Sequence, residues 1–356
     1  MSSGGACQYQ PLPIDEENIA AEAFSRYREL YPEVYKQSSD YLKSQINEDF
    51  SYLVRYMRES LAVDDAAIFL DYISWALVRL DSLNIPRVTF KRSLGAFNDI
   101  LLRELSVEAG TRASVYIARA NDVLSLPQGE IPSYIRDDNP LAGNARAYLA
   151  ALISSDREGA RILLMGLLDK KVSIGDLYRY VFEPVLQETG RLWQIHQLSI
   201  AQEHYITAAT QLFMTLLYDR MREEKVQQRK DRYIITTSVS DEYHDLGIRM
   251  VSDFFEMDGW NTFYTGANTP ARSVIKMIRD HHADAAAISC TMAFHIPRVF
   301  ELIQGIRADP AISGTRILVG GYPFNLKPDL WQCMGADAGA STADEAVEKM
   351  NRLFSL

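Results

Sequence analysis

The chain has 356 residues, of which 47% are hydrophobic and 24% charged, as in an ordinary soluble globular protein. This length exceeds one ordinary core, so we expect two or three domains. A formal net charge of −10 argues against direct binding of nucleic acid. No apolar run reaches the roughly 18 residues that a membrane span needs. With no secretion signal and only Cys7, Cys290 and Cys333, we expect a cytoplasmic protein without a disulfide framework.

The N-terminal third is predicted to be helical. Residues 1–14 contain two prolines and are predicted to be a tail. Residues 15–125 repeat apolar side chains every three or four positions, which predicts an all-α domain. Its helices are expected at 15–31, 34–46, 50–61, 64–83 and 89–124. The domain is rich in aromatic residues and has no histidine, because the six histidines of the chain all come later, at His196, His204, His244, His281, His282 and His295.

Two further domains follow a linker at 126–141 that is rich in proline and aspartate. Residues 142–228 have a helical pattern, and helices at 144–153, 156–169, 173–195 and 200–225 would form a four-helix bundle. Residues 229–356 alternate strands with helices, which predicts a doubly wound, parallel, Rossmann-like α/β sheet. Its strands are expected at 233–239, 262–264, 285–289 and 316–319.

The loop after the first of these strands carries Glu242, His244 and Gly247. A neutral imidazole is a good ligand for a transition metal, and a neighbouring carboxylate can fix its tautomer. The simpler alternative for this motif alone is a solvated polar loop. Two more elements follow at the ends of later strands. Ser289 and Thr291 follow, with 41 residues between Gly247 and Ser289, and 28 residues then separate Thr291 from the pair 320–321, Gly-Gly.

Together these three elements resemble the cobalamin-binding module shared by methionine synthase, corrinoid methyl carriers and cobalamin photoreceptors. The resemblance implies that His244 is the lower axial cobalt ligand and that Ser289 and Thr291 hydrogen-bond the displaced dimethylbenzimidazole tail. It also implies that Gly320 and Gly321 keep a slot open for this tail. Glu242 departs from the aspartate usual in the family, and its extra methylene lengthens the relay to the histidine. The loop with Gly266 and the residue His295 are also expected near the ligand, whereas His281 and His282 are expected on the surface.

A second motif lies in the predicted bundle, where Trp193 is followed after nine residues by Glu203 and His204. It resembles the cap of the light-responsive, adenosylcobalamin-dependent transcriptional repressors. The resemblance implies that the tryptophan packs over the adenosyl group and that the Glu-His pair lines its pocket. These repressors have a histidine directly after the tryptophan as an upper ligand after illumination, but this chain has Gln194. Either His196 substitutes for it as the metal ligand, or another ligand such as water does.

The N-terminal domain loosely resembles haem-free sensor globins, although its aromatic residues are also what core packing would require. Without a histidine it cannot hold haem through an imidazole, whereas a linear tetrapyrrole such as biliverdin needs only an aromatic slot and cations for its propionates. A thioether link would have to use Cys7. The candidate arginines are Arg55, Arg58, Arg79, Arg87 and Arg92. The combination with a cobalamin module resembles the photocobilins.

The predicted function is therefore a non-enzymatic light sensor that binds adenosylcobalamin, with its own base displaced and His244 bound, and also biliverdin. Light would cleave the cobalt–carbon bond and change both the domain arrangement and the state of a homo-oligomer, with no membrane or nucleic acid as a partner. One alternative is a corrinoid methyl carrier that serves methyltransferases. Another is a cobalamin-responsive regulator that does not use light.

Overall fold

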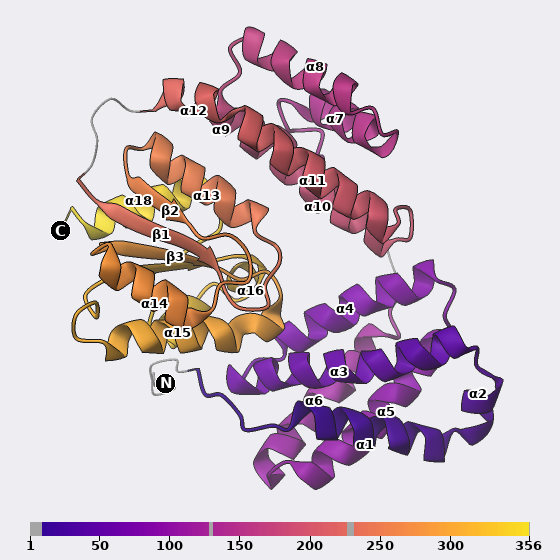
Figure 1. Cartoon of the computed structure of the whole chain (residues 1–356). Helices are drawn as coiled ribbons and strands as arrows, with labels where there is room; N and C mark the ends of the chain where they lie inside the picture. Colours follow the sequence, from indigo (N-terminus) through magenta and orange to yellow (C-terminus); the bar gives the residue numbers. More distant parts are fainter. Residues whose placement is uncertain (1–8, 128–130, 226–230, 356) are drawn as a thin grey trace.

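The computed structural model describes residues 9–127, 131–225 and 231–355 (Figure 1). The N-terminal helices pack around buried aromatic side chains, among them Tyr27, Phe50 and Phe97, none of which is exposed. Core packing therefore accounts for these three residues. The helices are α1 (Glu16–Leu30), α2 (Pro32–Gln37), α3 (Asp40–Ala62), α4 (Ala67–Ser82), α5 (Arg87–Glu104) and α6 (Val107–Val123).

Three predicted helix boundaries in this region are wrong. The predicted helix over 34–46 is interrupted, because Ser38 is extended and the side chain of Ser39 accepts a hydrogen bond from the Leu42 N–H, so that α3 starts anew. The predicted helix over 89–124 is interrupted because Leu105 is extended and the side chain of Ser106 accepts a hydrogen bond from the Ala109 N–H, so that α6 starts anew. The predicted gap between 46 and 50 does not exist. α3 runs through it without a break, because neither glycine nor proline stands there.

The second helical segment, which we call the cap, comprises α7 to α12. The cap helix that carries Trp193 has a widened turn, η1 (Tyr178–Phe182), between α9 (Ile174–Leu177) and α10 (Glu183–Gln194). Ser199 and Gln202 form a capping box that starts the next helix. The remaining cap helices are α7 (Ala142–Ile153), α8 (Arg157–Asp169), α11 (Ile200–Leu216) and α12 (Tyr218–Glu224).

The C-terminal region contains a parallel five-stranded sheet in the order β2-β1-β3-β4-β5. The prediction of helices followed by a parallel α/β sheet is confirmed. The last strand was missed, because Ala338-Gly339-Ala340 has no β-branched or aromatic residue. The strands are β1 (Tyr233–Ser238), β2 (Asn261–Tyr264), β3 (Ala285–Ser289), β4 (Arg316–Gly320) and β5 (Ala338–Ala340).

Helices cover both faces of the sheet (Figure 1). α13 (Leu246–Met257) and α18 (Ala343–Leu353) pack on one face, and α14 (Ala271–Asp280) and α15 (Ile296–Ala308) on the other. A single turn, η2 (Ala293–His295), precedes α15. The strand order reverses between β1 and β3, because β2 is added on one side of β1 and β3 on the other. In such sheets ligands bind beyond the carboxyl ends of the strands at this point. Two short helices that the sequence did not predict, α16 (Tyr322–Leu326) and α17 (Leu330–Met334), follow β4.

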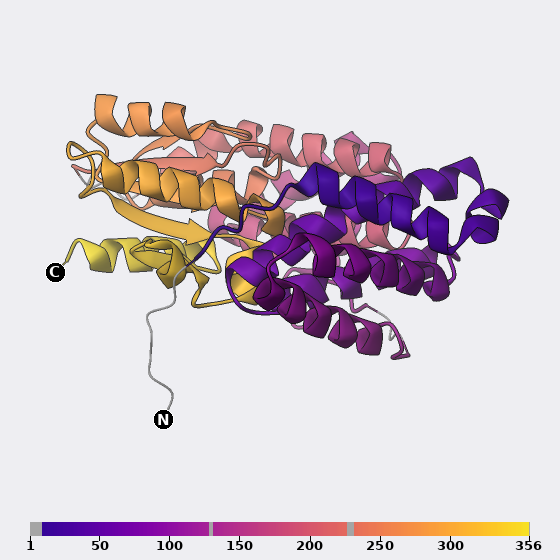
Figure 2. The same ribbon diagram turned by 90° about the horizontal axis from the view of Figure 1, so that it is seen from below.

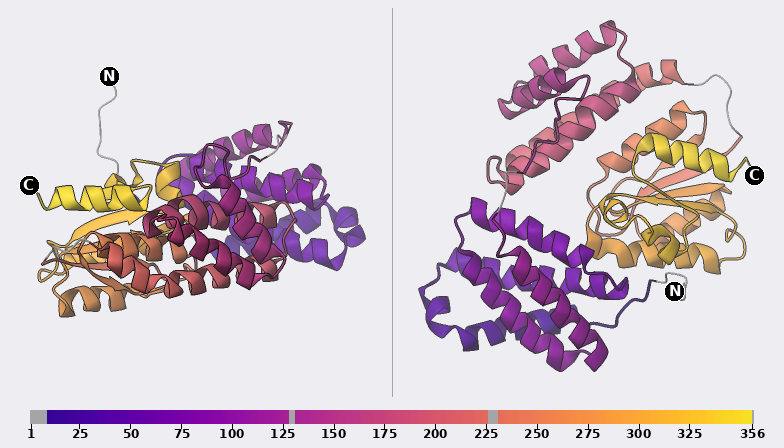
Figure 3. Two further views of the ribbon diagram at one scale, coloured as in Figure 1. Left: turned by 90° about the horizontal axis from the view of Figure 1, so that it is seen from above. Right: turned by 180° about the vertical axis from the view of Figure 1, so that it is seen from behind.

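The carboxyl edge of the sheet faces the other two parts of the molecule (Figures 1 and 2). The N-terminal domain contacts this edge through α3 and α4, and α4 also reaches the end of α10 in the cap, which Figure 3 shows from behind. In the ranges that the structure describes, we find no helix long and apolar enough for a membrane span.

Candidate functional site

The turn after β1 places Glu242 inside the protein and His244 at its surface. Asp241 adopts a left-handed conformation (φ 67°), and its N–H donates to the side chain of Asn268 at 2.8 Å. Asn268 in turn donates its own N–H to the Glu242 carbonyl at 2.9 Å. This turn leaves the Glu242 side chain fully buried, while 61% of the His244 side chain is exposed. The loop is therefore built around a buried carboxylate.

Glu242 accepts hydrogen bonds with both carboxylate oxygens. Oε1 accepts from the His244 backbone N–H at 3.1 Å and lies 2.6 Å from His244 Nδ1. Oε2 accepts from the N–H groups of Thr291 and Met292, both at 2.9 Å, and lies 3.1 Å from Nδ1 of His295. One carboxylate therefore joins the β1 loop to the loop after β3.

These contacts determine the charge state of the pair. Burial alone would raise the pKa of Glu242, but the hydrogen bonds from His244 and His295 outweigh it and hold the pKa far below its usual range. The hydrogen bond to Glu242 raises the pKa of His244. Glu242 is thus an anionic acceptor, so the proton of the neutral His244 ring resides on Nδ1. The Nε2 lone pair is left for a metal.

The cap helix α11 approaches the His244 imidazole. The carboxylate of Glu203 on α11 is close enough to help raise the pKa of His244. Glu203 accepts a hydrogen bond from the Thr207 hydroxyl at 3.0 Å and lies 3.4 Å from Nε2 of His204, whose side chain is 72% exposed. The structure therefore brings Glu203 and His204 to the same side of the sheet as His244.

A row of small residues crosses the sheet at its carboxyl end. The register pairs Ser238 with Ser289, Ser289 with Gly320 and Gly320 with Ala340. By the two-residue alternation of strands, these side chains face α13 and α18. On the same face, the buried hydroxyl of Thr236 has no hydrogen-bond partner among the described residues. Sequence reasoning found Ser289 and Gly320 but missed the other three, which only the register reveals.

The predicted site glycines differ in what surrounds them. A Cβ on Gly320 would lie 2.8 Å from the Ala340 carbonyl oxygen, and one on Gly321, at φ 103°, would lie 2.0 Å from that of Cys290. Close backbone packing therefore already requires both glycines. By contrast, a Cβ on Gly247 or on Gly266, at φ 81°, would meet no atom within 4 Å.

Trp193 lies at the end of α10 and contacts the N-terminal domain. Its ring is 5.9 Å from the ring of Trp75, and the Arg79 guanidinium lies 4.9 Å from its centre. Arg79 also donates to the Trp193 carbonyl at 3.0 Å. Gln194 is buried and donates to the Trp75 carbonyl at 3.0 Å. Gln194 therefore binds α4, whereas His196 is exposed in a left-handed turn (φ 60°).

The arginines predicted for a tetrapyrrole all contact protein groups. Arg87 pairs with Asp81 at 2.6 Å, and Arg92 lies over the ring of Tyr31. Arg55 and Arg58 contact the loop after β3, and Arg79 contacts Trp193 as described.

Two further predicted residues remain. Thr291 is half-buried and donates its N–H to Glu242. Cys7 lies outside the described residues.

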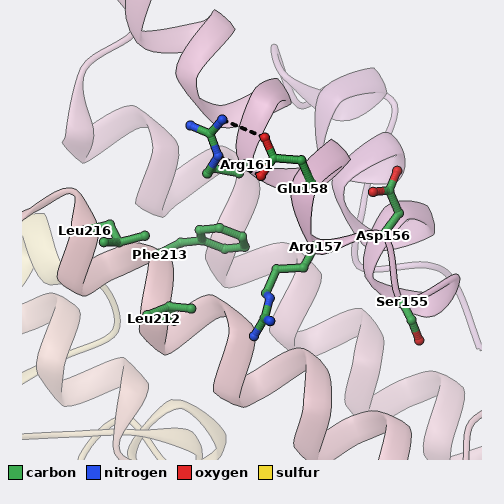
Figure 4. Close-up of a pocket in the computed structure, with 8 residues that line it drawn as sticks. All are labelled: Ser155, Asp156, Arg157, Glu158, Arg161, Leu212, Phe213 and Leu216. Atoms are coloured by element: carbon green, nitrogen blue, oxygen red, sulfur yellow. Dashed lines mark hydrogen bonds and ion pairs between the residues drawn. The ribbon is translucent and has the colours of Figure 1, made fainter.

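An open pocket of about 390 Å³ lies elsewhere, between α8 and α11 (Figure 4). Arg157 and the pair Glu158–Arg161 line one side, and Phe213 and Leu216 line the other. None of the predicted site residues takes part, so this pocket is not the site of His244.

The residues around His244 fit a metal that brings its own equatorial ligands. Within the described ranges, no three His, Cys, Asp or Glu side chains are grouped to hold a bare metal ion. A single imidazole suffices for cobalt in a corrin ring, whose four nitrogens supply the rest. The open space beside Gly247 and Gly266 and the small residues along the sheet edge suit a large, flat ligand with a tail.

Comparisons with known proteins agree with this interpretation. Two family models match, both described as a B12 binding domain, one at residues 232–350 and one at residues 145–218. Dimethylamine corrinoid protein 1 of Methanosarcina acetivorans is 24% identical over 172 residues, covering 48% of this chain and 76% of that protein. Dimethylamine corrinoid protein 3 of Methanosarcina mazei is 25% identical over 169 residues, covering 47% of this chain and 95% of that protein.

The solved monomethylamine corrinoid protein of Methanosarcina barkeri shares the fold, with a TM-score of 0.53 at 17% identity. The match covers 60% of this chain and 99% of that one. The two family models confirm the cobalamin prediction. The dimethylamine corrinoid relatives favour the methyl-carrier alternative over the light sensor, and neither of them supports light sensing or biliverdin. Residues 145–218 and 232–350 thus form B12 binding domains, and the chain is a cobalamin-binding protein.

Proposed function

We propose that the protein is a cobalamin-dependent light sensor in which the N-terminal domain responds to the state of the corrinoid. The observation that carries the proposal is the contact of α4 with Trp193. Trp75, Arg79 and Gln194 tie the cap tryptophan to a domain that lies outside both B12 models. About 40% of this chain has no counterpart in the solved monomethylamine corrinoid protein. A sensor needs such a connection, whereas a methyl carrier needs an upper face that its partners can reach.

Each predicted site residue has a defined task in this proposal. His244 offers Nε2 to cobalt from below, and Glu242 fixes the tautomer of its ring. Ser289 and Thr291 bind the displaced tail. Trp193, Glu203 and His204 line the upper side. The bound adenosylcobalamin would supply a cobalt–carbon bond that light can break.

The switch would lie between the cap and α4. A group that leaves the upper side changes what Trp193 contacts, and a ligand shifts an equilibrium only through such differential contacts. The contacts of α4 with Trp193 and Gln194 then transmit the change to the N-terminal domain. The output would be a change in the assembly of this chain with further copies of itself.

The test is to load the full chain with adenosylcobalamin in the dark and then to illuminate it. We expect a change of the cobalt absorbance and, by light scattering, a change of oligomer size. A loaded protein that is photostable would remove the light-sensing claim. An assembly that responds to cobalamin equally in dark and light would support the light-independent regulator.

Biliverdin is a separate part of the proposal. The absence of histidine before residue 196 fits a chromophore that needs no imidazole ligand. Co-expression with a haem oxygenase should give a protein with red absorbance. A colourless protein would remove biliverdin and leave the cobalamin proposal intact.

The second candidate function is a corrinoid methyl carrier, which the two dimethylamine corrinoid relatives favour. The two functions differ in access to the upper face. If Trp193 covers that face, Trp193→Ala should speed the binding of cyanide to the hydroxocobalamin-loaded protein. A carrier with an open upper face predicts the same rate for both proteins. Trp331→Ala is the control, because Trp331 packs against Gly339 of the edge strand β5.

A further inference from the structure

The N-terminal domain also contacts the loop after β3, through Phe294. The Phe294 ring meets that of Tyr56 edge-on, with 5.5 Å between centroids, and that of Tyr52 at 6.1 Å. The Arg55 guanidinium lies 5.4 Å from its centre, and Arg58 donates to its carbonyl at 3.3 Å. Four side chains of α3 therefore hold this one residue of the sheet domain.

Arg58 is itself firmly held. Its Nε donates to the fully buried Glu59 at 2.6 Å, and it also pairs with Glu16 of α1. Glu59 accepts from the Tyr9 hydroxyl at 2.7 Å, and the Tyr9 N–H donates to the Cys333 carbonyl at 3.0 Å. The position of Arg58 is thus set by several elements, so its bond to the Phe294 carbonyl ties η2 to the N-terminal domain.

Phe294 is adjacent to His295, the second imidazole on Glu242. The two rings lie edge to face at 4.5 Å, and both residues belong to the single turn η2. Only 12% of the His295 side chain is exposed, and its Nδ1 lies 3.1 Å from Glu242 Oε2. The other oxygen of this carboxylate holds His244. A displacement of η2 therefore changes the position of the group that orients His244.

We propose that α3 of the N-terminal domain positions the lower cobalt ligand, by way of Phe294, His295 and Glu242. His295 acts here as a positioning residue, through its contact with Glu242. This inference rests on the proposed role of His244 and deepens it: the domain that holds Trp193 above the ring also sets the histidine below it. By linkage, ligation of His244 also strengthens the docking of α3.

The experiment uses the full chain loaded with cob(II)alamin. The histidines of the chain are labelled with 15N. In the EPR spectrum a 15N imidazole on cobalt splits the lines into doublets, whereas the 14N of the cofactor's own base gives triplets, so the spectrum gives the ratio of His-bound to His-free cobalt. His295→Leu removes the donor to Glu242, whereas His295→Asn keeps an N–H donor near the position of Nδ1. Phe294→Ala leaves His295 in place but removes the ring through which η2 contacts α3. His282→Asn is the matched control, because His282 is exposed with φ at 49° and asparagine tolerates this conformation.

We expect the ratio of His-bound to His-free cobalt to fall about tenfold in His295→Leu and in Phe294→Ala, as for the loss of an outer-shell partner. His295→Asn should restore most of it, and His282→Asn should match the wild type. In the double variant Phe294→Ala should add little to His295→Leu, because both act along one route. If circular dichroism shows that Phe294→Ala does not fold, Phe294→Leu, which keeps apolar volume, takes its place.

The outcomes separate this inference from the proposed function. A wild type without the 15N doublets would overturn both, because His244 would not be the ligand. A wild type with the 15N doublets, together with Phe294 variants that keep the wild-type ratio, would overturn only the role of α3. A His295→Leu variant that loses stability but keeps the ratio would show His295 to be purely structural.

Discussion

Glu242 stands where the resembling family usually has aspartate, and the sequence predicts a longer relay to His244. The structure shows which contacts the longer side chain makes. The carboxylate still reaches Nδ1 of His244 at 2.6 Å, and its second oxygen reaches two backbone N–H groups and His295. The extra methylene thus lets one buried side chain hold two loops.

Glu242→Gln should therefore destabilise the protein even without cobalamin. The amide nitrogen of glutamine would face N–H donors, and the charge-assisted hydrogen bonds are lost; we expect a loss of about 2–3 kcal/mol in the free energy of unfolding. Urea unfolding of the apo-protein measures it. Glu301→Gln, on an exposed salt bridge to Arg298, is the control and should change stability by less than about 0.5 kcal/mol. Equal stability of both variants would contradict the structural role of Glu242.

Gly321→Ala tests the backbone at the end of β4. A Cβ there would lie 2.0 Å from the Cys290 carbonyl oxygen, and φ is 103°. We expect a loss of about 2–4 kcal/mol, because both strain and a backbone clash arise. Gly95→Ala, on an exposed helical position with no atom within 4 Å of a Cβ, should instead stabilise by about 0.5–1 kcal/mol. Thermal unfolding of both variants checks the opposite signs.

At the scale of elements, strong local patterns made most of the fold predictable. The apolar runs of β1, β3 and β4 and the periodic helices are local signals, and the motif residues come at strand ends that a parallel sheet aligns. β5 could not be predicted, because its Ala-Gly-Ala sequence has no local preference for a strand. Pairing with β4 and packing of Gly339 against Trp331 make it extended.

The site was predictable only in part for the same reason. Its spacing pointed to His244, Ser289 and Gly320, but the partner of Gln194 is a carbonyl group 119 residues away, on Trp75. Such contacts depend on how domains dock, and no local pattern encodes them.

Gln194→His tests whether this position can supply an upper cobalt ligand. The side chain at 194 is buried against α4, so we expect the new histidine not to reach cobalt. The visible spectrum of hydroxocobalamin-loaded protein should equal that of the wild type, while the variant loses stability through the broken contact with the Trp75 carbonyl. A spectrum with a new nitrogen ligand would show that the cap can rotate away from α4.

At the scale of the whole molecule, polar contacts join the N-terminal domain to the sheet domain. Tyr322 donates to Asp71 at 2.7 Å and Lys327 pairs with Asp65. Tyr9, whose N–H donates to the Cys333 carbonyl, donates its hydroxyl to the buried Glu59. Burial raises the pKa of Glu59 to about 7, and the neighbouring Arg58 and Tyr9 only partly oppose it. The domain interface therefore contains a carboxyl group that titrates near neutral pH.

Because the pKa of Glu59 is higher in the folded state than its ordinary value of 4.5, its contribution to stability is complete below about pH 4.5 and is lost as the pH rises through 7. Glu59→Gln keeps the shape of the protonated side chain and removes this titration. The stability of the variant relative to the wild type should therefore increase by about 1–3 kcal/mol between pH 5 and pH 8, as measured by urea unfolding at both pH values. Glu348→Gln, on an exposed pair with Arg352, should show no such change. A difference between Glu59→Gln and the wild type that is constant with pH would mean that Glu59 stays ionised at the interface, and that Arg58 rather than burial determines its charge.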